Sequence, residues 1–315
     1  MKGFILFILA VLICFSSFTY AQLSGNKYIG TGGDYTTFAI ACSTLNADGV
    51  GAGGVTFIIY TGTYTESAPL SIDIATNKPT SENPVTFKPD VGATVVLNVG
   101  GQLTGSRWAI RIGTSANTVD YVTLDGSNSL GGTTRDWTIK STAATYGIEP
   151  IDIYGDYCTV KNCIIDMNNG GYSGSGFGIT LREATPTSNF CTIQNNYIKG
   201  NNGISVGRNT TVEQEGHLIK GNEIHSLNRG IYVYRSKNII IEENEIIGDA
   251  YSGYPAGACY GIYTASASGN TGELVIRNNI IRNLGSNSGT IAAQTIRCIN
   301  PSGPGTYKIY GNKIY

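Results

Sequence analysis

Hydrophobic and polar positions alternate in short blocks along the second half of the chain. Each block begins with glycine and then places isoleucine, leucine or valine at every second position. A period of two is typical of half-buried β-strands. The blocks are GITLR (178–182), GISVGR (203–208), GIYVYR (230–235) and GIYTA (261–265), with GIEPIDIY (147–154) as a looser first copy.

A six-residue pattern follows most of these blocks. Its copies are VKNCII (160–165), IQNNYI (193–198), IKGNEI (219–224), IEENEI (241–246), IRNNII (276–281) and IYGNKI (309–314). The first and last positions are β-branched in every copy, so we expect them to point inward. The third position is Asn or Gly in five copies, and these residues enter the left-handed region most cheaply. It therefore predicts a sharp backbone bend.

The fourth position of the pattern is asparagine in all copies but the first. The five residues are Asn196, Asn222, Asn244, Asn279 and Asn312. A side-chain amide both donates and accepts, so stacked copies could form a ladder that satisfies backbone groups at the bends. The second and fifth positions vary, as solvent-facing positions do. The acids of IIIEENEIIG (239–248) therefore mark a corner, with Glu243 as the odd residue at the bend position.

The repeats contain no helix-length amphipathic stretch, which favours coils stacked directly on one another. With its short coils and asparagine ladder, the chain resembles the right-handed parallel β-helix proteins of the pectin-lyase-like superfamily. This resemblance is specific over residues 147–315 and weaker before them. It implies an all-β, single-stranded parallel β-helix. The segment GTGGDYTTFAIACSTL (30–45) further resembles the N-terminal cap of pectin methylesterase-type β-helices, with a short capping helix over 38–45.

The N-terminus predicts export. Lys2 precedes the apolar run FILFILAVLICF, and a small-x-small pattern ends at Ala21, so residues 1–21 are interpreted as a secretory signal peptide. We expect residues 22–60 to form the cap and first coil, and 61–315 the remaining coils. Because the sequence stops partway through a coil, we expect a truncated C-terminal end and a further domain. The predicted location is secreted, extracellular or at the cell surface, without membrane insertion after signal cleavage.

Composition narrows the partners. The formal net charge is −1 and only 14% of residues are charged, which gives no electrostatic reason to expect nucleic acid. Cys158 and Cys191 match across one repeat, but parallel side chains in adjacent coils meet disulfide geometry poorly, so buried thiols are favoured. His217 falls in the same column, which favours a structural role.

The motifs of the superfamily's enzymes are missing from this sequence. Neither His217 nor His225 lies in the Gly-His-Gly of polygalacturonases, and the Gln-Asp-Thr of pectin methylesterases is absent. So is the Arg-x-Pro-x-x-Arg of calcium-dependent pectate lyases. The resemblance therefore transfers no catalytic set, and the fold alone supplies no function.

The outward positions of the glycine-led blocks predict a surface strip. One column is predicted to hold Glu149, Thr180, Ser205, Tyr232 and Tyr263. The predicted substrate-binding residues are Arg182, Arg208, Tyr232, Tyr234, Arg235 and Tyr263. Tyrosine faces pack on the apolar faces of sugar rings, and arginine forks pair with uronate or sulfate groups. The alternative is that these residues are ordinary cross-strand pairs.

The leading interpretation is a module that binds extracellular or cell-surface polysaccharide. The alternatives are a uronate lyase and a structural or adhesive solenoid. A lyase needs a base, for which Arg208, Arg235 and Lys237 are the clustered basic candidates, although the pKa that an arginine base requires is hard to reach. No cofactor is expected. Ca²⁺ could bind Asp120 with Asp125, or Asp166 with Asn168, but turn chemistry explains these residues better.

Overall fold

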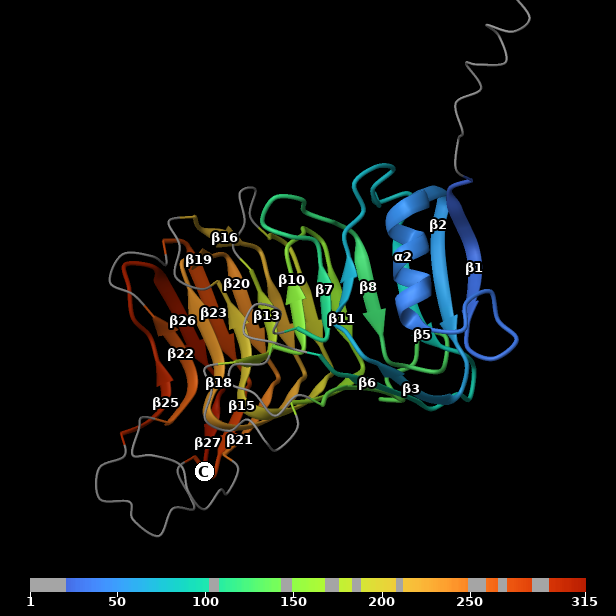
Figure 1. Ribbon diagram of the computed structural model, residues 1–315. Coiled ribbons are helices and arrows are strands. Elements are labelled where there is room, and N and C mark those ends of the chain that lie inside the picture. The colour runs from blue at the N-terminus through green and yellow to red at the C-terminus, as the bar shows by residue number, and fades with distance from the viewer. Residues whose placement is uncertain are drawn as a thin grey trace, which may run out of the picture.

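The chain folds as an elongated solenoid of parallel β-strands with one helix at its N-terminal end (Figure 1). The computed structural model describes residues 21–101, 108–142, 149–167, 176–182, 188–207, 212–248, 259–265, 271–284 and 295–315. Residues 1–20 of the predicted signal peptide lie outside this part. Within the described part, no helix is long and apolar enough to span a membrane.

Every named strand pair is parallel, and two large sheets build the walls. In hydrogen-bonded order, the ten-stranded sheet contains β1 (Leu23–Ile29), β2 (Val50–Ile59), β5 (Val85–Pro89), β8 (Val122–Asp125), β11 (Thr159–Lys161), β14 (Thr192–Gln194), β17 (Leu218–Lys220), β20 (Ile239–Glu242), β23 (Glu273–Arg277) and β26 (Thr306–Tyr310). Each strand comes from a successive coil, so the sheet runs along the whole solenoid.

The fifteen-stranded sheet divides into two rows. Its main row contains β3 (Gly62–Glu66), β6 (Val95–Val99), β9 (Trp137–Ser141), β12 (Cys163–Asp166), β15 (Tyr197–Val206), β18 (Glu223–Tyr234), β21 (Glu245–Gly248), β24 (Ile280–Arg282) and β27 (Lys313–Ile314). A side row contains β4 (Leu70–Ile72), β7 (Ile110–Ile112), β10 (Ile151–Ile153), β13 (Phe177–Leu181), β22 (Cys259–Ala265) and β25 (Ile296–Asn300), and passes through the long strands β15 and β18. A separate pair consists of β16 (Gln214–Glu215) and β19 (Ser236–Lys237).

The inward columns match the repeat. The first and last positions of the six-residue pattern are 0% exposed in the first five copies, as predicted. In the last copy, Ile309 is 41% and Ile314 is 55% exposed, because no described coil covers them. Burial of stacked isoleucines and valines from adjoining coils therefore supplies the core.

The asparagine ladder forms as predicted. All six residues at the third position have φ between 52° and 67°, so the chain bends through the left-handed region at every corner. Next to each bend, the asparagine amide bridges two coils. Asn222 Nδ2, for example, donates to Asn244 Oδ1 at 2.9 Å and to the Ile193 carbonyl at 2.9 Å, while Asn222 Oδ1 accepts from the Asn196 backbone and side chain.

The second position of the pattern was predicted to face solvent, but in one coil it is buried. Glu242 is only 6% exposed, because its carboxylate is held between Lys220 and Arg277 on the two neighbouring strands. The Lys220 Nζ and Arg277 Nε atoms lie 2.8 and 2.7 Å from its oxygens. Equivalent positions of neighbouring coils lie one strand spacing apart, so these opposite charges can pair. The mixture of residue types at this position did not predict the pairing.

A second ladder of hydrogen bonds, which was not predicted, runs along the N-terminal ends of strands β8, β11 and β14 in the ten-stranded sheet. Oδ1 of Asp120 accepts from the Asp156 backbone, and Oδ1 of Asp156 accepts from the Asn189 backbone. The following residues, Tyr121, Tyr157 and Phe190, have positive φ, and their rings stack at 4.9 and 5.2 Å. Burial is the main cause that raises the pKa of Asp156.

The N-terminal helix α2 (Phe38–Asp48) covers the end of the solenoid. The predicted helix over 38–45 is confirmed and extends three residues further. Thr37 caps its N-terminus by accepting from the Ile40 backbone. Glu66 of β3 adds a carboxylate that accepts from the Phe38 and Ala39 amides at 2.9 and 3.3 Å. Negative charge at a helix N-terminus is stabilising, so Glu66 ties the cap to the first coil.

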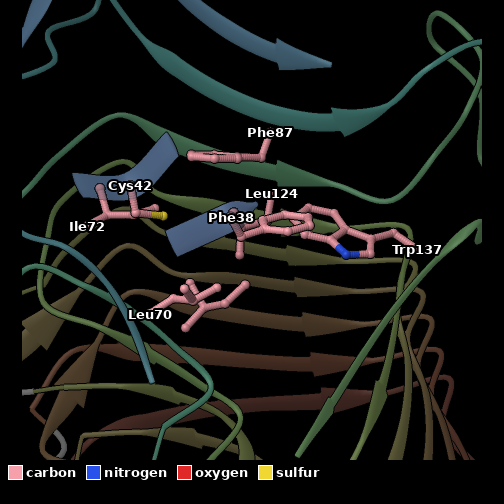
Figure 2. A pocket seen from close by; sticks show the side chains of 8 residues that line it. Phe38, Cys42, Leu70, Ile72, Phe87, Leu124 and Trp137 are labelled. Carbon is pink, nitrogen blue, oxygen red and sulfur yellow. The ribbon is translucent and has the colours of Figure 1, made fainter. Parts of the chain in front are cut away.

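A small apolar cavity lies beneath this cap (Figure 2). Phe38, Cys42, Phe87 and Trp137 are among the side chains that line it, and its volume is about 10 Å³. That volume holds at most one water molecule. The cavity is a packing gap and has no room for a sugar.

The cysteines and His217 are structural. All six cysteines of the described chain are free thiols, and Cys158 and Cys191 are fully buried, as predicted. His217 is 1% exposed, and its Nδ1 accepts from the Cys191 backbone at 3.1 Å. Burial lowers the pKa of His217 to about 3, so the ring is neutral at pH 7 and holds a backbone amide.

Candidate functional site

The glycine-led blocks form the side row of the fifteen-stranded sheet. Its register pairs Ile151 with Ile179, which aligns Asp152 with Thr180. The column therefore contains Asp152, Thr180, Ser205, Tyr232 and Tyr263. The predicted surface positions Thr180 and Ser205 are 0% exposed and Asp152 is 1% exposed, so only the two tyrosines of this column reach the surface. The prediction that Glu149 belongs to this column was wrong, because Pro150 rather than Gly147 occupies the glycine position in that coil.

Each block needs its glycine because neighbouring coils lie too close to that position to leave room for a side chain. A Cβ on Gly203 would lie 2.3 Å from the Gly230 carbonyl and 2.4 Å from Ile224, and a Cβ on Gly230 would lie 2.5 Å from Ile246. The residue before this position in each coil belongs to a second column, and in two coils the position holds Pro150 and Cys298 in place of glycine. That column contains Glu149, Phe177, Asn202, Arg229, Tyr260 and Arg297.

Arginine and tyrosine side chains gather where these two columns meet on β18 and β22. The guanidinium carbon of Arg229 lies 5.1 Å from the ring centre of Tyr232 and 6.0 Å from that of Tyr263. Tyr263 also stacks on Tyr260, with ring centres 4.4 Å apart and planes at 17°. We call these four residues, with Arg297 over Tyr260 at 5.9 Å, the Arg-Tyr cluster.

Two further predicted residues adjoin the cluster. Tyr234 lies 6.3 Å from Tyr232 with nearly parallel rings, and the guanidinium carbon of Arg235 lies 5.8 Å from the ring centre of Tyr234. Arg235 has φ 47°, a region that a side chain of this size enters at a cost. The structure thus brings Tyr232, Tyr234, Arg235 and Tyr263 together as one continuous surface.

Arg182 was predicted to belong to the same surface strip, but its interactions differ from those of these residues. Its guanidinium pairs with Glu149 and, at 3.1 Å, with Asp152. Both carboxylate side chains are at most 2% exposed. Arg182 therefore neutralises buried acids. Arg208, the other predicted arginine of the strip, lies outside the described residues.

Lys237 is also engaged. Its Nζ lies 2.9 Å from the Glu215 carboxylate, and this hydrogen bond is the first cause that raises the pKa of Lys237. A lysine that holds its proton more tightly is a weaker general base at neutral pH. Of the predicted basic candidates, the structure describes only Arg235 as lying against the cluster.

Several buried polar atoms near the cluster lack a partner in the described chain. They are Thr180 Oγ1, Asn202 Oδ1, Gln214 Oε1, Ser226 Oγ, Arg229 Nε and Arg235 Nε. Buried polar atoms are nearly always hydrogen-bonded, so such a concentration indicates a place for a polar ligand or water. Thr180, Asn202 and Arg229 belong to the side row, Ser226 belongs to the main row, and Gln214 lies on β16.

The suggested Ca²⁺ ligands have other partners. Asp125 pairs with Lys161 at 3.2 Å and Asp166 with Lys140 at 3.4 Å, while Asn168 lies outside the described residues. Across the described ranges, the His, Cys, Asp and Glu side chains form no group of three or more that could hold a metal ion.

Sequence reasoning missed Arg229, Tyr260 and Arg297. Each lies in the column just before the inward-facing glycine position, where the chain turns into the side row. Alternation within the strand marks only the residues after that position. For Arg229 and Tyr260, the place just before the glycine of a block was the available signal. Arg297 precedes Cys298 and had no such signal.

Comparison with known proteins agrees on the fold. No protein-family model matches the chain, and no curated protein does. Among solved structures, the pectate lyase Pel9A matches 93% of this chain and 79% of its own length, at 12% identity and a TM-score of 0.57. An alginate lyase from Paenibacillus sp. str. FPU-7 matches 86% and 97%, at 13% identity and a TM-score of 0.51.

A third solved structure is a 1,3-α-1,4-β-D-galactose-4-sulfate-3,6-anhydro-D-galactose-2-sulfate 4 galactohydrolase. It matches 84% of this chain and 61% of its own length, at 12% identity and a TM-score of 0.51. At such identities the likeness establishes architecture. The chain has the right-handed parallel β-helix fold, as its repeats predicted.

Proposed function

We propose that this protein is a secreted β-helix module that binds extracellular or cell-surface polysaccharide through the Arg-Tyr cluster. The observation that carries the proposal is Arg229. Its guanidinium lies over two tyrosine rings, and its buried Nε has no partner in the described chain. A structural arginine in such a place would have its donors satisfied.

The chemistry of the cluster suits sugar rings. Tyrosine rings offer apolar faces and polar edges, and arginine forks offer several donors in fixed directions. The solved structures to which this fold is similar include a pectate lyase, an alginate lyase and a galactohydrolase of a sulfated galactose polymer. Export to a compartment that contains such polymers is supported by the apolar N-terminal segment of residues 1–21.

A lyase is the second candidate, and Arg235 is the observation that favours it. Its positive φ is the kind of backbone strain that concentrates at functional sites. Its Nε is buried and unpartnered in the described chain, close to where a substrate would lie. Proton removal next to a uronate carboxylate would leave an unsaturated product that absorbs ultraviolet light.

Affinity electrophoresis through gels that contain acidic or neutral polysaccharides tests both candidates. We expect retardation on at least one polymer, weakened about tenfold or more by Tyr232→Ala and by Arg235→Ala, because each removes a central contact. Tyr310→Ala is the matched control, since Tyr310 is 49% exposed on the ten-stranded sheet. Retention without ultraviolet absorbance supports the binding module, whereas absorbance would establish the lyase. No retention on any polymer would contradict both.

A further inference from the structure

The side chains of Asn202 and Arg229 occupy neighbouring positions on β15 and β18. The two residues are register partners in the parallel sheet, so their side chains leave it in the same direction. Asn202 is 1% exposed and its Oδ1 has no partner in the described chain. The Nε atom of Arg229 is buried and equally unpartnered. One unmet acceptor and one unmet donor are therefore carried by register partners on adjacent strands.

The orientation of the Asn202 amide is fixed by its other hydrogen bond. Its Nδ2 donates to the Gly176 carbonyl at 2.8 Å, and a flipped amide would place two acceptors against each other there. Oδ1 must therefore remain the atom of the amide that has no partner in the described chain. Asn202 Oδ1 can therefore accept a hydrogen bond from a ligand donor.

We infer that Asn202 and Arg229 together recognise a neutral hydroxyl group of a bound sugar, a role that rests on the proposed function. A hydroxyl accepts from Arg229 Nε and donates to Asn202 Oδ1 at the same time. A carboxylate or sulfate only accepts, so its lone pairs would face those of Asn202 Oδ1. An ammonium group only donates and would face the guanidinium.

The surroundings of the pair fit a hydroxyl carried on a ring. Tyr232 and Tyr263 lie against Arg229, and Tyr260 stacks on Tyr263, so a sugar ring could pack on tyrosine while its hydroxyl reaches the pair. Any acidic group of the same polymer must then be read elsewhere. Arg297 within the cluster and Arg235 against Tyr234 carry the charge for that purpose.

The decisive experiment compares one acidic polymer, polygalacturonate, with the same polymer after its carboxyl groups are reduced to alcohols. Dissociation constants are measured by affinity electrophoresis for the wild type and for Arg229→Gln. If Arg229 reads a hydroxyl, the substitution weakens binding about tenfold on both polymers alike, because both keep the ring hydroxyls. A loss confined to the acidic polymer would mean that Arg229 reads the carboxylate, and would overturn the inference.

Asn202→Leu provides the second arm. It removes the acceptor and should weaken binding on both polymers by a similar factor. Ser141→Ala is its matched control, because Ser141 Oγ is another buried, unpartnered atom of the described chain but belongs to β9. Urea unfolding of each variant confirms that it is folded at the binding temperature.

The remaining outcomes are also informative. Unchanged binding in Asn202→Leu would overturn the inference, since the pair would then hold only water. If the wild type retains only the acidic polymer, because Arg235 or Arg297 requires its carboxylate, Asn202→Leu on that polymer decides: weakened binding supports the hydroxyl site, and unchanged binding overturns it while the proposed function stands. If neither polymer nor any other glycan binds the wild type, the proposed function fails and the hydroxyl site fails with it.

Discussion

A single residue at each bend sets the path of the solenoid. Asparagine and glycine occupy the left-handed position in five coils because their cost there is low. Glu243 adopts the same conformation, with φ 59°, and has a half-exposed side chain near Lys220. The backbone of this coil thus follows its neighbours rather than the preference of its own residue.

The asparagine next to Glu243 is expected to contribute much more to stability. Asn244 accepts from the backbone and side chain of Asn222 and donates to the Ile219 carbonyl and to Asn279, all while 1% exposed. Asn244→Ala leaves these buried groups without partners, so we expect a loss of about 2–4 kcal/mol in the free energy of unfolding, measured in urea. Asn312→Ala, at the partly exposed last rung, is the control and should cost less. Equal losses would argue against a buried ladder.

Single positions could be predicted from the sequence because each column of the repeat has the same structural requirement in every coil. An inward position demands a β-branched side chain and a bend demands Asn or Gly, so the core columns and the ladder could be predicted. The pairing of Arg182 with Glu149 could not, because it depends on a register that Pro150 shifts by three residues relative to Gly147. Residues that meet through an irregular coil leave no periodic signal.

Strands of adjoining coils are joined by side chains as well as by backbone. Glu242 of β20 bridges Lys220 of β17 and Arg277 of β23. The hydrogen bond from Lys220 is the first cause that lowers the pKa of Glu242 below its ordinary value of 4.5, and Arg277 adds to it. The carboxylate is therefore more favourable in the folded chain than in the unfolded one.

This bridge predicts a pH dependence of stability. Because the folded-state pKa is depressed, the contribution of Glu242 is fully present above about pH 4.5 and is lost as the pH falls through the lower folded-state value. Glu242→Gln should cost about 2 kcal/mol at pH 7 and should lose less stability than the wild type on acidification, as followed by urea unfolding. The control Glu273→Gln breaks a more exposed pair with Lys308 and should change little. Parallel pH profiles for the wild type and Glu242→Gln would refute the bridge.

The elements differ in how far sequence could define them. Helix α2 ran three residues past its expected end, since the run from Phe38 keeps a buried face as far as Leu45 and continues to Asp48 before Gly49. The Arg-Tyr cluster was half predicted, because Tyr232 and Tyr263 alternate within strands. Arg229 and Tyr260 lie within β18 and β22, each just before the glycine of its block, and only stacking of the coils brings them into one surface.

The whole molecule is a one-dimensional stack, in which each coil contacts mainly the coils before and after it. Function on such a scaffold comes from a surface that several coils share, as β15, β18, β22 and β25 share the proposed binding surface. This arrangement also explains why the fold could be predicted from repeats while its ligand could not. The repeat encodes the stacking, and the outward residues vary from coil to coil.

A polypeptide of residues 1–315 should open first at the end where its core side chains are exposed. Helix α2 covers the N-terminal coil, whereas Ile309 and Ile314 of the last described coil are 41% and 55% exposed. We therefore expect amide hydrogen exchange in β26 and β27 to be faster than in β17 and β20 by a factor of about 100 or more, because fraying breaks only one interface. The strands β1 and β2 serve as the control, since the helix should keep them protected. Uniform protection along all coils would show instead that the solenoid opens as a single cooperative unit.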